Sequence, residues 1–368
     1  MSMKKFFAPG RVNLIGEHLD YNGGLVLPAA LEMGITLTVT ESTGNTIKLR
    51  SSSHSFQKEF NADDNLEFDS ANDWANYPMG VIQHLKREGF TIPAVELFYE
   101  SNLPEGAGLS SSAAIEVLTA YALLSVTNAN INLTWLADFC RNVENEFIGV
   151  KCGIMDQYSV ALGKKDHAIL LDCAAVKHTY VPFDLEEYRL VIMNTNKPRS
   201  LIHSKYNERK AECDEALRII QTAISGIKHL CDAEMHHLDL IADETIQQRA
   251  RHVISENLRV KEAVKVLRFN DLSTFGRLMN ASHRSLKEDY EVTGIELDTL
   301  AETAQETKGC LGARMTGAGF GGCAIAIVNE AALNEFKETV SKKYTDVTRL
   351  TASFYETVIG DGVRAIEA

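Results

Sequence analysis

The sequence predicts an α+β protein built from two lobes. The chain has 368 residues, more than one ordinary hydrophobic core accommodates, so two domains are the first expectation. Strand-like segments alternate with helical ones in the first half, whereas long charged helices dominate from about residue 204. This change in composition predicts a boundary near residues 183–200. We therefore expect an N-terminal lobe of residues 1–187 and a C-terminal lobe of residues 188–368.

Short β-rich runs and helical periodicities define the expected elements of the first half. The predicted strands are Leu25–Leu27, Ile35–Thr40, Thr46–Leu49, Ala94–Tyr99, Ala168–Leu171 and Arg189–Asn194. The predicted helices are Asn76–Gly89, Ser110–Thr127 and Leu133–Phe147.

The second half combines amphipathic helices with a β-rich tail. Helices are expected over Lys205–Ile224, Glu244–Leu267 and Asp271–Glu288. Strands are expected over Ala324–Val328 and Thr348–Val358. No internal repeat or low-complexity segment interrupts this order.

Composition restricts the partners and the compartment. A formal net charge of −13 argues against nucleic acid or an anionic membrane as a partner. The seven cysteines are odd in number and form no C-x-x-C pair, which favours free thiols in a reducing compartment. The sequence has neither a signal-peptide core nor an apolar run of membrane-spanning length. We expect a cytoplasmic protein with no obligatory protein partner.

The first candidate site is the segment Gly10–Gly24. It places Arg11, Glu17, His18 and Asp20 among apolar residues and glycines. Ionisable groups in such surroundings are costly unless they pair or bind something polar. Together they could hydrogen-bond a polyhydroxylated substrate. The alternative is an internal salt-bridge cluster at the seam between two domains.

The second candidate site is a loop of glycines and serines that leads into a helix. The first turn of a helix carries unpaired N–H donors and partial positive charge, which attract phosphate. Serine hydroxyls add ligands for phosphate or for a hard cation. A serine-rich N-cap without a ligand is the plainer interpretation. Neither a Walker-type P-loop nor the protein-kinase motifs are present. The expected nucleotide contacts in this loop are Gly106, Ala107, Gly108, Leu109, Ser110, Ser111 and Ser112.

Taken together, the motifs resemble a known family. G-R-V-N-L-I-G-E-H-x-D-Y-N-G-G and P-x-G-A-G-L-S-S-S-A, followed by Cys152–Gln157 and Met315–Gly322, are similar to the galactokinase branch of the GHMP kinases. The likeness spans the chain and implies a ribosomal-protein-S5-like N-terminal lobe and a ferredoxin-like C-terminal lobe. Leu19 departs from the pattern, because the family usually has threonine there, so one local substrate contact is in doubt.

The resemblance implies an ATP-dependent kinase that phosphorylates the C1 hydroxyl of D-galactose, the first committed step of galactose catabolism. It makes Asp156 the general base and Arg11 the residue that supports the transition state, and a neighbouring arginine would keep the aspartate ionised. A capping aspartate is the alternative for Asp156. Asp20 is expected to contact the C3 and C4 hydroxyls, and Glu17 and His18 the region near C6. The implied substrate-binding residues are Glu17, His18, Leu19, Asp20, Gly153 and Tyr206.

The resemblance also implies a Mg²⁺ ion bound with ATP. Ser112 and Glu144 would supply two protein oxygens, with phosphate and water completing the shell. Glu146 is the rival of Glu144 by proximity, and a solvated helix face is the alternative for both.

The remaining nucleotide contacts are less specific. Trp74 could stack on adenine, or it could be a buried core residue. Ser51 is a candidate contact for which a polar turn is the better explanation. Gly317–Gly322 matches G-x-G-x-x-G but precedes a β-like run rather than a helix, so we interpret it as a glycine wall beside the site.

Two alternative functions are compatible with the motifs. One is a kinase of a related sugar, such as N-acetylgalactosamine or L-arabinose, because sequence does not reveal the pocket volume near C2. The other is a sugar-sensing regulator built on an inactive kinase, which should have lost the base or part of the serine loop.

Overall fold

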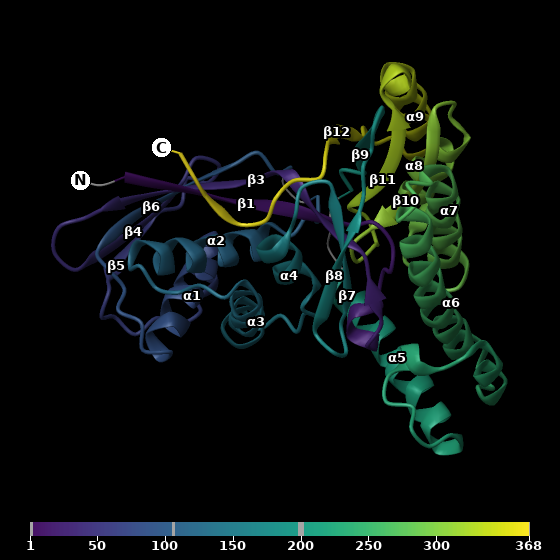
Figure 1. Ribbon diagram of the computed structural model, residues 1–368, viewed down its shortest axis with the longest axis horizontal. Coiled ribbons are helices and arrows are strands. Elements are labelled where there is room, and N and C mark those ends of the chain that lie inside the picture. The colour runs from purple at the N-terminus through teal and green to yellow at the C-terminus, as the bar shows by residue number, and fades with distance from the viewer. Residues whose placement is uncertain (1–2, 105–106, 198–201, 368) are drawn as a thin grey trace.

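The computed structural model describes residues 3–104, 107–197 and 202–367. It has the predicted α+β architecture in two lobes that lie side by side (Figure 1). No helix within these residues is long and apolar enough to cross a membrane.

The first lobe is a twisted sheet covered by helices. The strand order is β13-β1-β3-β6-β4-β5, and β4 and β6 pair in parallel while the other neighbours are antiparallel. Helices α1, α2, α3 and α4 lie on the same side of this sheet (Figure 1). The strands are β1 (Met3–Asn13), β3 (Pro28–Glu41), β4 (Thr46–Ser51), β5 (Lys58–Asn61), β6 (Val95–Ser101) and β13 (Arg364–Ile366). The helices are α1 (Asn76–Arg87), α2 (Ser111–Val126), α3 (Leu133–Val143) and α4 (Met155–Leu162).

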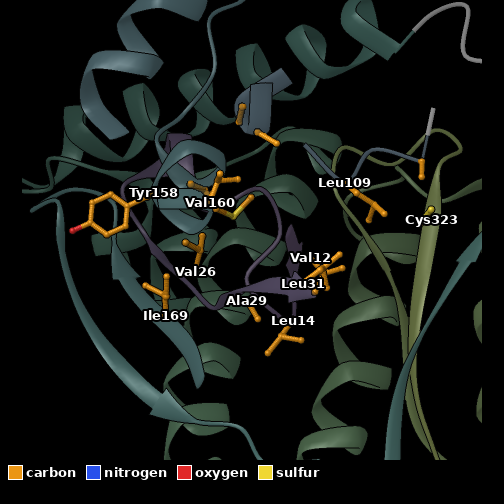
Figure 2. Packing of buried hydrophobic residues seen from close by; sticks show 14 of the residues in the cluster. Val12, Leu14, Val26, Ala29, Leu31, Leu109, Tyr158, Val160, Ile169 and Cys323 are labelled. Atoms are coloured by element: carbon orange, nitrogen blue, oxygen red, sulfur yellow. The ribbon is translucent and has the colours of Figure 1, made fainter. Parts of the chain in front are cut away.

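A smaller antiparallel sheet joins this lobe to the second one. Its strands, in the order β2-β7-β8, are β2 (Leu25–Val26), β7 (His167–Asp172) and β8 (Lys177–Pro182). Figure 2 shows apolar side chains of β1, β3, α4 and β7 that pack together here, among them Val12, Leu31, Val160 and Ile169. This core supports the segment that carries the first motif.

The second lobe is an antiparallel sheet packed against long helices. The strand order is β10-β11-β9-β12, and α7 and α8 pack on β10. The strands are β9 (Tyr188–Asn194), β10 (Cys310–Thr316), β11 (Cys323–Asn329) and β12 (Ser353–Thr357). The helices are α5 (Ile202–Ala223), α6 (Glu244–Leu267), α7 (Leu272–Glu288), α8 (Gly294–Glu306) and α9 (Leu333–Thr348).

The chain end returns to the first lobe. Residues 364–366 form β13, which pairs with β1 from Lys5 to Phe7. Both ends of the chain therefore lie near each other beside β1 (Figure 1). This strand departs from the predicted division, which placed all of residues 188–368 in the second lobe; the boundary after residue 187 remains a prediction.

Two local predictions were wrong in detail. A single helix is expected over Leu133–Phe147. In the structure α3 ends at Val143, and a π-helical turn follows over Glu144–Ile148. The strand expected over Thr348–Val358 is shorter, because α9 extends to Thr348 and β12 begins only at Ser353.

Candidate active site

An ion pair between Arg11 and Asp156 lies at the centre of the site. Arg11 Nε donates to Asp156 Oδ1 and Nη2 donates to Oδ2, each at 2.8 Å. This two-point geometry is the strong form of an arginine–carboxylate contact. Arg11, near the end of β1, is 6% exposed, whereas Asp156, in the first turn of α4, keeps 30% of its side chain exposed. The carboxylate is therefore held in one orientation and can still be reached.

The phosphate loop is attached to the same pair. Arg11 Nη1 donates to the carbonyl of Gly108 at 2.8 Å, and Ser110 Oγ donates to Asp156 Oδ2 at 2.5 Å. Ser110 precedes α2 with φ 60°, in the left-handed region, and its hydroxyl does not cap the helix. Such a backbone is costly for a residue other than glycine, and the bond to Asp156 offsets that cost. Ala107, Leu109 and Ser110 are buried, whereas Gly106 lies outside the described residues.

A cavity of about 900 Å³ opens beside the start of α2. That volume suits a nucleotide-sized ligand. Ser51, Trp74, Ser111 and Ser112 all line it. The Trp74 side chain is nevertheless buried, with its indole N–H donated to the Phe56 carbonyl at 3.2 Å. Trp74 is thus a buried residue that also lines the cavity, and stacking on adenine stays a prediction.

Asp20 and Gly153 lie next to each other, and the charge of Asp156 is close to Asp20. A Cβ on Gly153 would come within 2.3 Å of Asp20 Oδ2, so only glycine leaves room for the carboxyl. Burial, together with the neighbouring carboxylates of Asp156 and Glu17, raises the pKa of Asp20 to about 7. The site therefore concentrates acidic groups at the place where the resemblance puts the sugar hydroxyls.

Aromatic rings from both lobes surround His18. The Tyr206 ring on α5 lies 5.8 Å from His18 and 5.3 Å from Tyr21, measured between ring centroids. His18 Nδ1 is bonded to the Tyr21 hydroxyl at 2.8 Å, and that hydroxyl is bonded to Tyr290. Burial lowers the pKa of His18 to about 3, so its ring is neutral. Leu19, in contrast, is fully buried in the apolar core.

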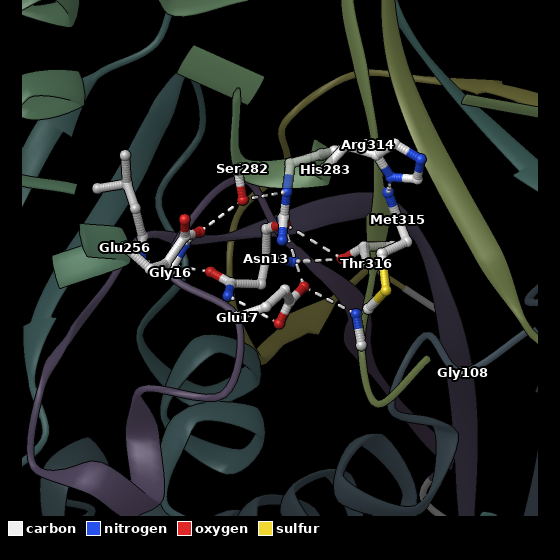
Figure 3. Close-up of polar contacts among 12 residues, drawn as sticks. Asn13, Gly16, Glu17, Gly108, Glu256, Ser282, His283, Arg314, Met315 and Thr316 are labelled. Atoms are coloured by element: carbon white, nitrogen blue, oxygen red, sulfur yellow. Dashed lines mark hydrogen bonds and ion pairs between the residues drawn. The ribbon is translucent and has the colours of Figure 1, made fainter. Parts of the chain in front are cut away.

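Glu17 joins the two lobes. Its Oε2 accepts from Asn13 Nδ2 at 3.0 Å, and its Oε1 accepts from the backbone N–H of Gly317 at 2.8 Å. Arg314 on β10 contacts the same Oε1 at 3.4 Å (Figure 3). Glu17 thus forms the interlobe salt bridge that was the alternative interpretation of the first motif, and its charge also acts on Asp20.

The buried cluster around Glu17 continues into the second lobe. Arg314 Nη1 donates to the carbonyl of Asn13 at 2.9 Å and Nε donates to Ser282 Oγ at 3.2 Å. Glu256 accepts from Ser282 and from the backbone of Gly16 (Figure 3). Buried charges without partners are costly; here Glu17 pairs with Arg314, and Glu256 pairs with Arg259. The cluster fixes the first motif against the second lobe.

Glu144 rather than Glu146 faces the phosphate loop. Glu144 continues α3 with helical backbone angles and is 8% exposed, within hydrogen-bonding range of Ser112. Glu146 points outward with 66% of its side chain exposed and pairs with His84. Within the described residues no three His, Cys, Asp or Glu side chains form a metal-binding group. Ser112 and Glu144 fit a cation whose other ligands are phosphate and water.

The glycine segment Gly317–Gly322 forms part of the boundary between the lobes. Gly317 and Gly319 adopt φ values of 86° and 81°, which favour glycine. A Cβ on Gly319 would meet the Val292 carbonyl at 2.3 Å. The segment leads into strand β11 rather than a helix, as the sequence predicts, and its role as a wall beside the site stays a prediction.

Comparison with known proteins matches three family models along the chain. They are the galactokinase galactose-binding signature (residues 4–41), the GHMP kinases N-terminal domain (76–164) and the GHMP kinases C-terminal domain (260–346). A galactokinase of Staphylococcus carnosus is 49% identical over 98% of this chain and 94% of its own length. One of Staphylococcus saprophyticus is 50% identical over 98% of this chain and 95% of its own. The chain belongs to the galactokinase family.

Solved structures agree with this galactokinase assignment. The Lactococcus lactis galactokinase complexed with galactose superposes with a TM-score of 0.94 and 45% identity, over 99% of this chain and 95% of that one. Methanococcus jannaschii mevalonate kinase, at 19% identity and a TM-score of 0.71 over 98% of both chains, shares the fold. The predicted GHMP kinase fold is confirmed.

Sequence reasoning missed several buried polar residues of this chain. Glu116 and Gln157 lie behind Glu144, and Glu256 and Arg314 lie behind Glu17. The available signal was a charged residue at a position with apolar neighbours, as for Arg314 between Ala313 and Met315. That signal indicates burial but not the partner.

Proposed function

We propose that this protein is a galactokinase, which transfers the γ-phosphoryl group of ATP to the C1 hydroxyl of D-galactose and yields α-D-galactose 1-phosphate and ADP. The observation that carries the proposal is the carboxylate of Asp156, held by Arg11 and Ser110 at the start of α2. It places a candidate base beside a helix N-terminus suited to phosphate. Names and structures of close relatives support the same reaction.

In this proposal Asp156 accepts the proton of the C1 hydroxyl as that oxygen attacks the γ-phosphorus. Its two oxygens are fixed by Arg11, so little reorganisation is needed during the step. Arg11 also offsets the charge that builds on the transferred phosphoryl group. Backbone N–H groups at the start of α2 bind the phosphates of the nucleotide.

We assign sugar recognition to the side of the site that holds the acidic and aromatic residues. Asp20 contacts the C3 and C4 hydroxyls, and Gly153 leaves space for it. His18, neutral and held by Tyr21, faces the C6 end together with Tyr206 from the second lobe. Glu17, occupied by donors from both lobes, positions this loop and adds a polar boundary near C6. Leu19 contributes through its backbone, because its side chain lies in the core.

Ser112 and Glu144 are the proposed ligands of Mg²⁺. When bound, the ion would neutralise phosphate charge and orient the γ-phosphoryl group. Ser51 and Trp74 line the cavity assigned to the nucleoside. A cytoplasmic location is part of the proposal and is supported by the buried thiols of Cys140 and Cys213.

The test is phosphoryl transfer from radiolabelled ATP to a panel of acceptors. The panel contains D-galactose, D-glucose, N-acetylgalactosamine, L-arabinose and mevalonate, with ADP release measured in parallel. We expect galactose to have the highest kcat/KM, with phosphorus NMR placing the phosphate on C1 in the α configuration. A higher kcat/KM for N-acetylgalactosamine or L-arabinose would assign the protein to another sugar, and no transfer to any acceptor would contradict kinase activity.

A further inference from the structure

Gln157 connects the candidate base to the candidate metal ligand. It follows Asp156 directly on α4 and its side chain is fully buried. Its amide nitrogen Nε2 donates to Glu144 Oε2 at 2.5 Å. The Cys152 thiol contacts the same oxygen at 3.5 Å. Both donors therefore reach Glu144 from one side and engage one oxygen of its carboxylate.

Behind Gln157 lies a carboxyl group that has no charged partner. Glu116, one turn after Ser112 on α2, has an exposed fraction of 0%. It is within hydrogen-bonding range of Gln157. Nevertheless, neither of its oxygens nor Gln157 Oε1 meets a donor among the described residues. Three buried acceptor oxygens thus lie close together, and none of them accepts a hydrogen bond from a described residue.

One proton resolves this arrangement. A buried carboxylate without a partner is costly, so such a group binds a proton instead. Burial, with the nearby charge of Glu144, raises the pKa of Glu116 well above its usual range. The neutral acid has one O–H, and the unpaired Oε1 of Gln157 is the acceptor next to it.

This bond would determine which way the amide of Gln157 points. With Oε1 held by the Glu116 hydroxyl, the N–H₂ group must face Glu144. The reversed amide would place its oxygen against the carboxylate of Glu144 and its N–H₂ group against the Glu116 hydroxyl, so the hydrogen bond to Glu144 would be lost, which is costly. The orientation of Gln157 therefore depends on a residue that, among the described residues, forms no hydrogen bond with Glu144.

We propose that Gln157, oriented by the buried acid Glu116, is a positioning residue that fixes the carboxylate of Glu144 for the divalent cation. Gln157 holds Oε2, and we assign Oε1 to the cation together with the hydroxyl of Ser112. This inference rests on the proposed function, since it assumes Glu144 as a metal ligand. Partners that orient metal ligands commonly affect metal affinity about 10- to 100-fold when removed.

The experiment measures Mn²⁺ binding to the enzyme–ADP complex by electron paramagnetic resonance, so it needs no turnover. Gln157→Leu and Glu116→Leu should each raise the Mn²⁺ dissociation constant about 10-fold or more. Glu116→Gln, whose amide can still donate to Gln157, should stay within about twofold of the unmodified protein. Gln83→Leu is the matched control, because Gln83 is another buried amide with two hydrogen bonds, to Leu66 and Asn65.

The outcomes separate the inference from the function on which it rests. Unchanged Mn²⁺ affinity in Gln157→Leu and Glu116→Leu, alongside weakened affinity in Glu144→Ala, would overturn the positioning role while leaving the metal ligand intact. Unchanged affinity in Glu144→Ala would instead refute the metal assignment. If Glu116→Gln binds Mn²⁺ as weakly as Glu116→Leu, the proposal that Glu116 donates a hydrogen bond to Gln157 is wrong. Should Gln157→Leu fail to fold, Gln157→Asn, whose shorter amide does not reach Glu144, takes its place.

Discussion

Replacing Asp20 with asparagine tests the electrostatics of the sugar side of the site. The substitution keeps the shape of the side chain and removes its charge. Burial and the carboxylates of Asp156 and Glu17 raise the pKa of Asp20 from 3.8 to about 7 in the native protein. The folded protein therefore binds a proton at Asp20 over a pH range in which the unfolded chain has released it.

The sign and size of the effect follow from this difference. Because the native pKa is above the unfolded one, the stabilisation from this proton is complete below pH 4 and is lost as pH rises to about 7. Each pKa unit corresponds to about 1.4 kcal/mol, so the loss between pH 5 and pH 8 is at most about 3 kcal/mol. The side chain is partly exposed, and solvent screening reduces the expected value to about 1–2 kcal/mol.

Urea unfolding at pH 5 and pH 8 measures this difference. The free energy of unfolding of Asp20→Asn, relative to the unmodified protein, should rise by about 1–2 kcal/mol between the two pH values. Asp346→Asn, a change at an exposed position of α9, should show no such trend. A difference for Asp20→Asn that stays constant from pH 5 to pH 8 would refute the crowding of carboxylates described here.

Three further predictions address selectivity, metal binding and the seam between the lobes. Asp20→Ala should weaken galactose far more than ATP and reduce the ratio of kcat/KM for galactose over glucose, because these sugars differ only in the direction of the C4 hydroxyl; an unchanged ratio would contradict the assigned contact. Glu144→Ala should raise the Mg²⁺ concentration needed for half-maximal turnover, whereas the exposed Glu146→Ala should not; the reverse result would exchange the two assignments. Arg314→Met should lower the free energy of unfolding by about 3 kcal/mol, because Glu17 then loses its buried cation. Lys265→Met, at an exposed ion pair, should change the free energy of unfolding by less than about 1 kcal/mol. Equal effects of the two substitutions would contradict the stabilising role of the buried cluster around Glu17.

Regular elements with clear periodicity were predictable, and those defined by distant partners were not. The helix expected over Glu244–Leu267 matches α6, since its apolar stripe and its N-cap Asp243 are both local signals. Strand β1 was not predicted, because Pro9 and Gly10 interrupt its pattern; the structure accommodates them at a register shift between Pro9 and Arg11. Strand β13 depends on pairing with residues more than 350 positions away, so no local pattern indicates it.

The candidate site shows the same limit. Glu144 and Glu146 are two residues apart, and an uninterrupted helix would not identify which one faces Ser112. The packing of α3 buries Glu144 and leaves Glu146 exposed, and the π-helical turn that follows has no reliable local signature in the sequence. Similarly, the sequence could indicate that Glu17 needs a partner, but the partner Arg314 comes from a strand of the other lobe. Motifs therefore located the chemistry, and packing between lobes determined its geometry.

The most direct test of the central claim is the turnover of Asp156→Asn with galactose and ATP, measured together with galactose binding. Asparagine preserves the shape beside Arg11 and Ser110 but is a far weaker proton acceptor. We predict that kcat falls by about 10²- to 10⁴-fold while the dissociation constant of galactose changes little. A kcat close to that of the unmodified enzyme would contradict the assignment of Asp156 as the base.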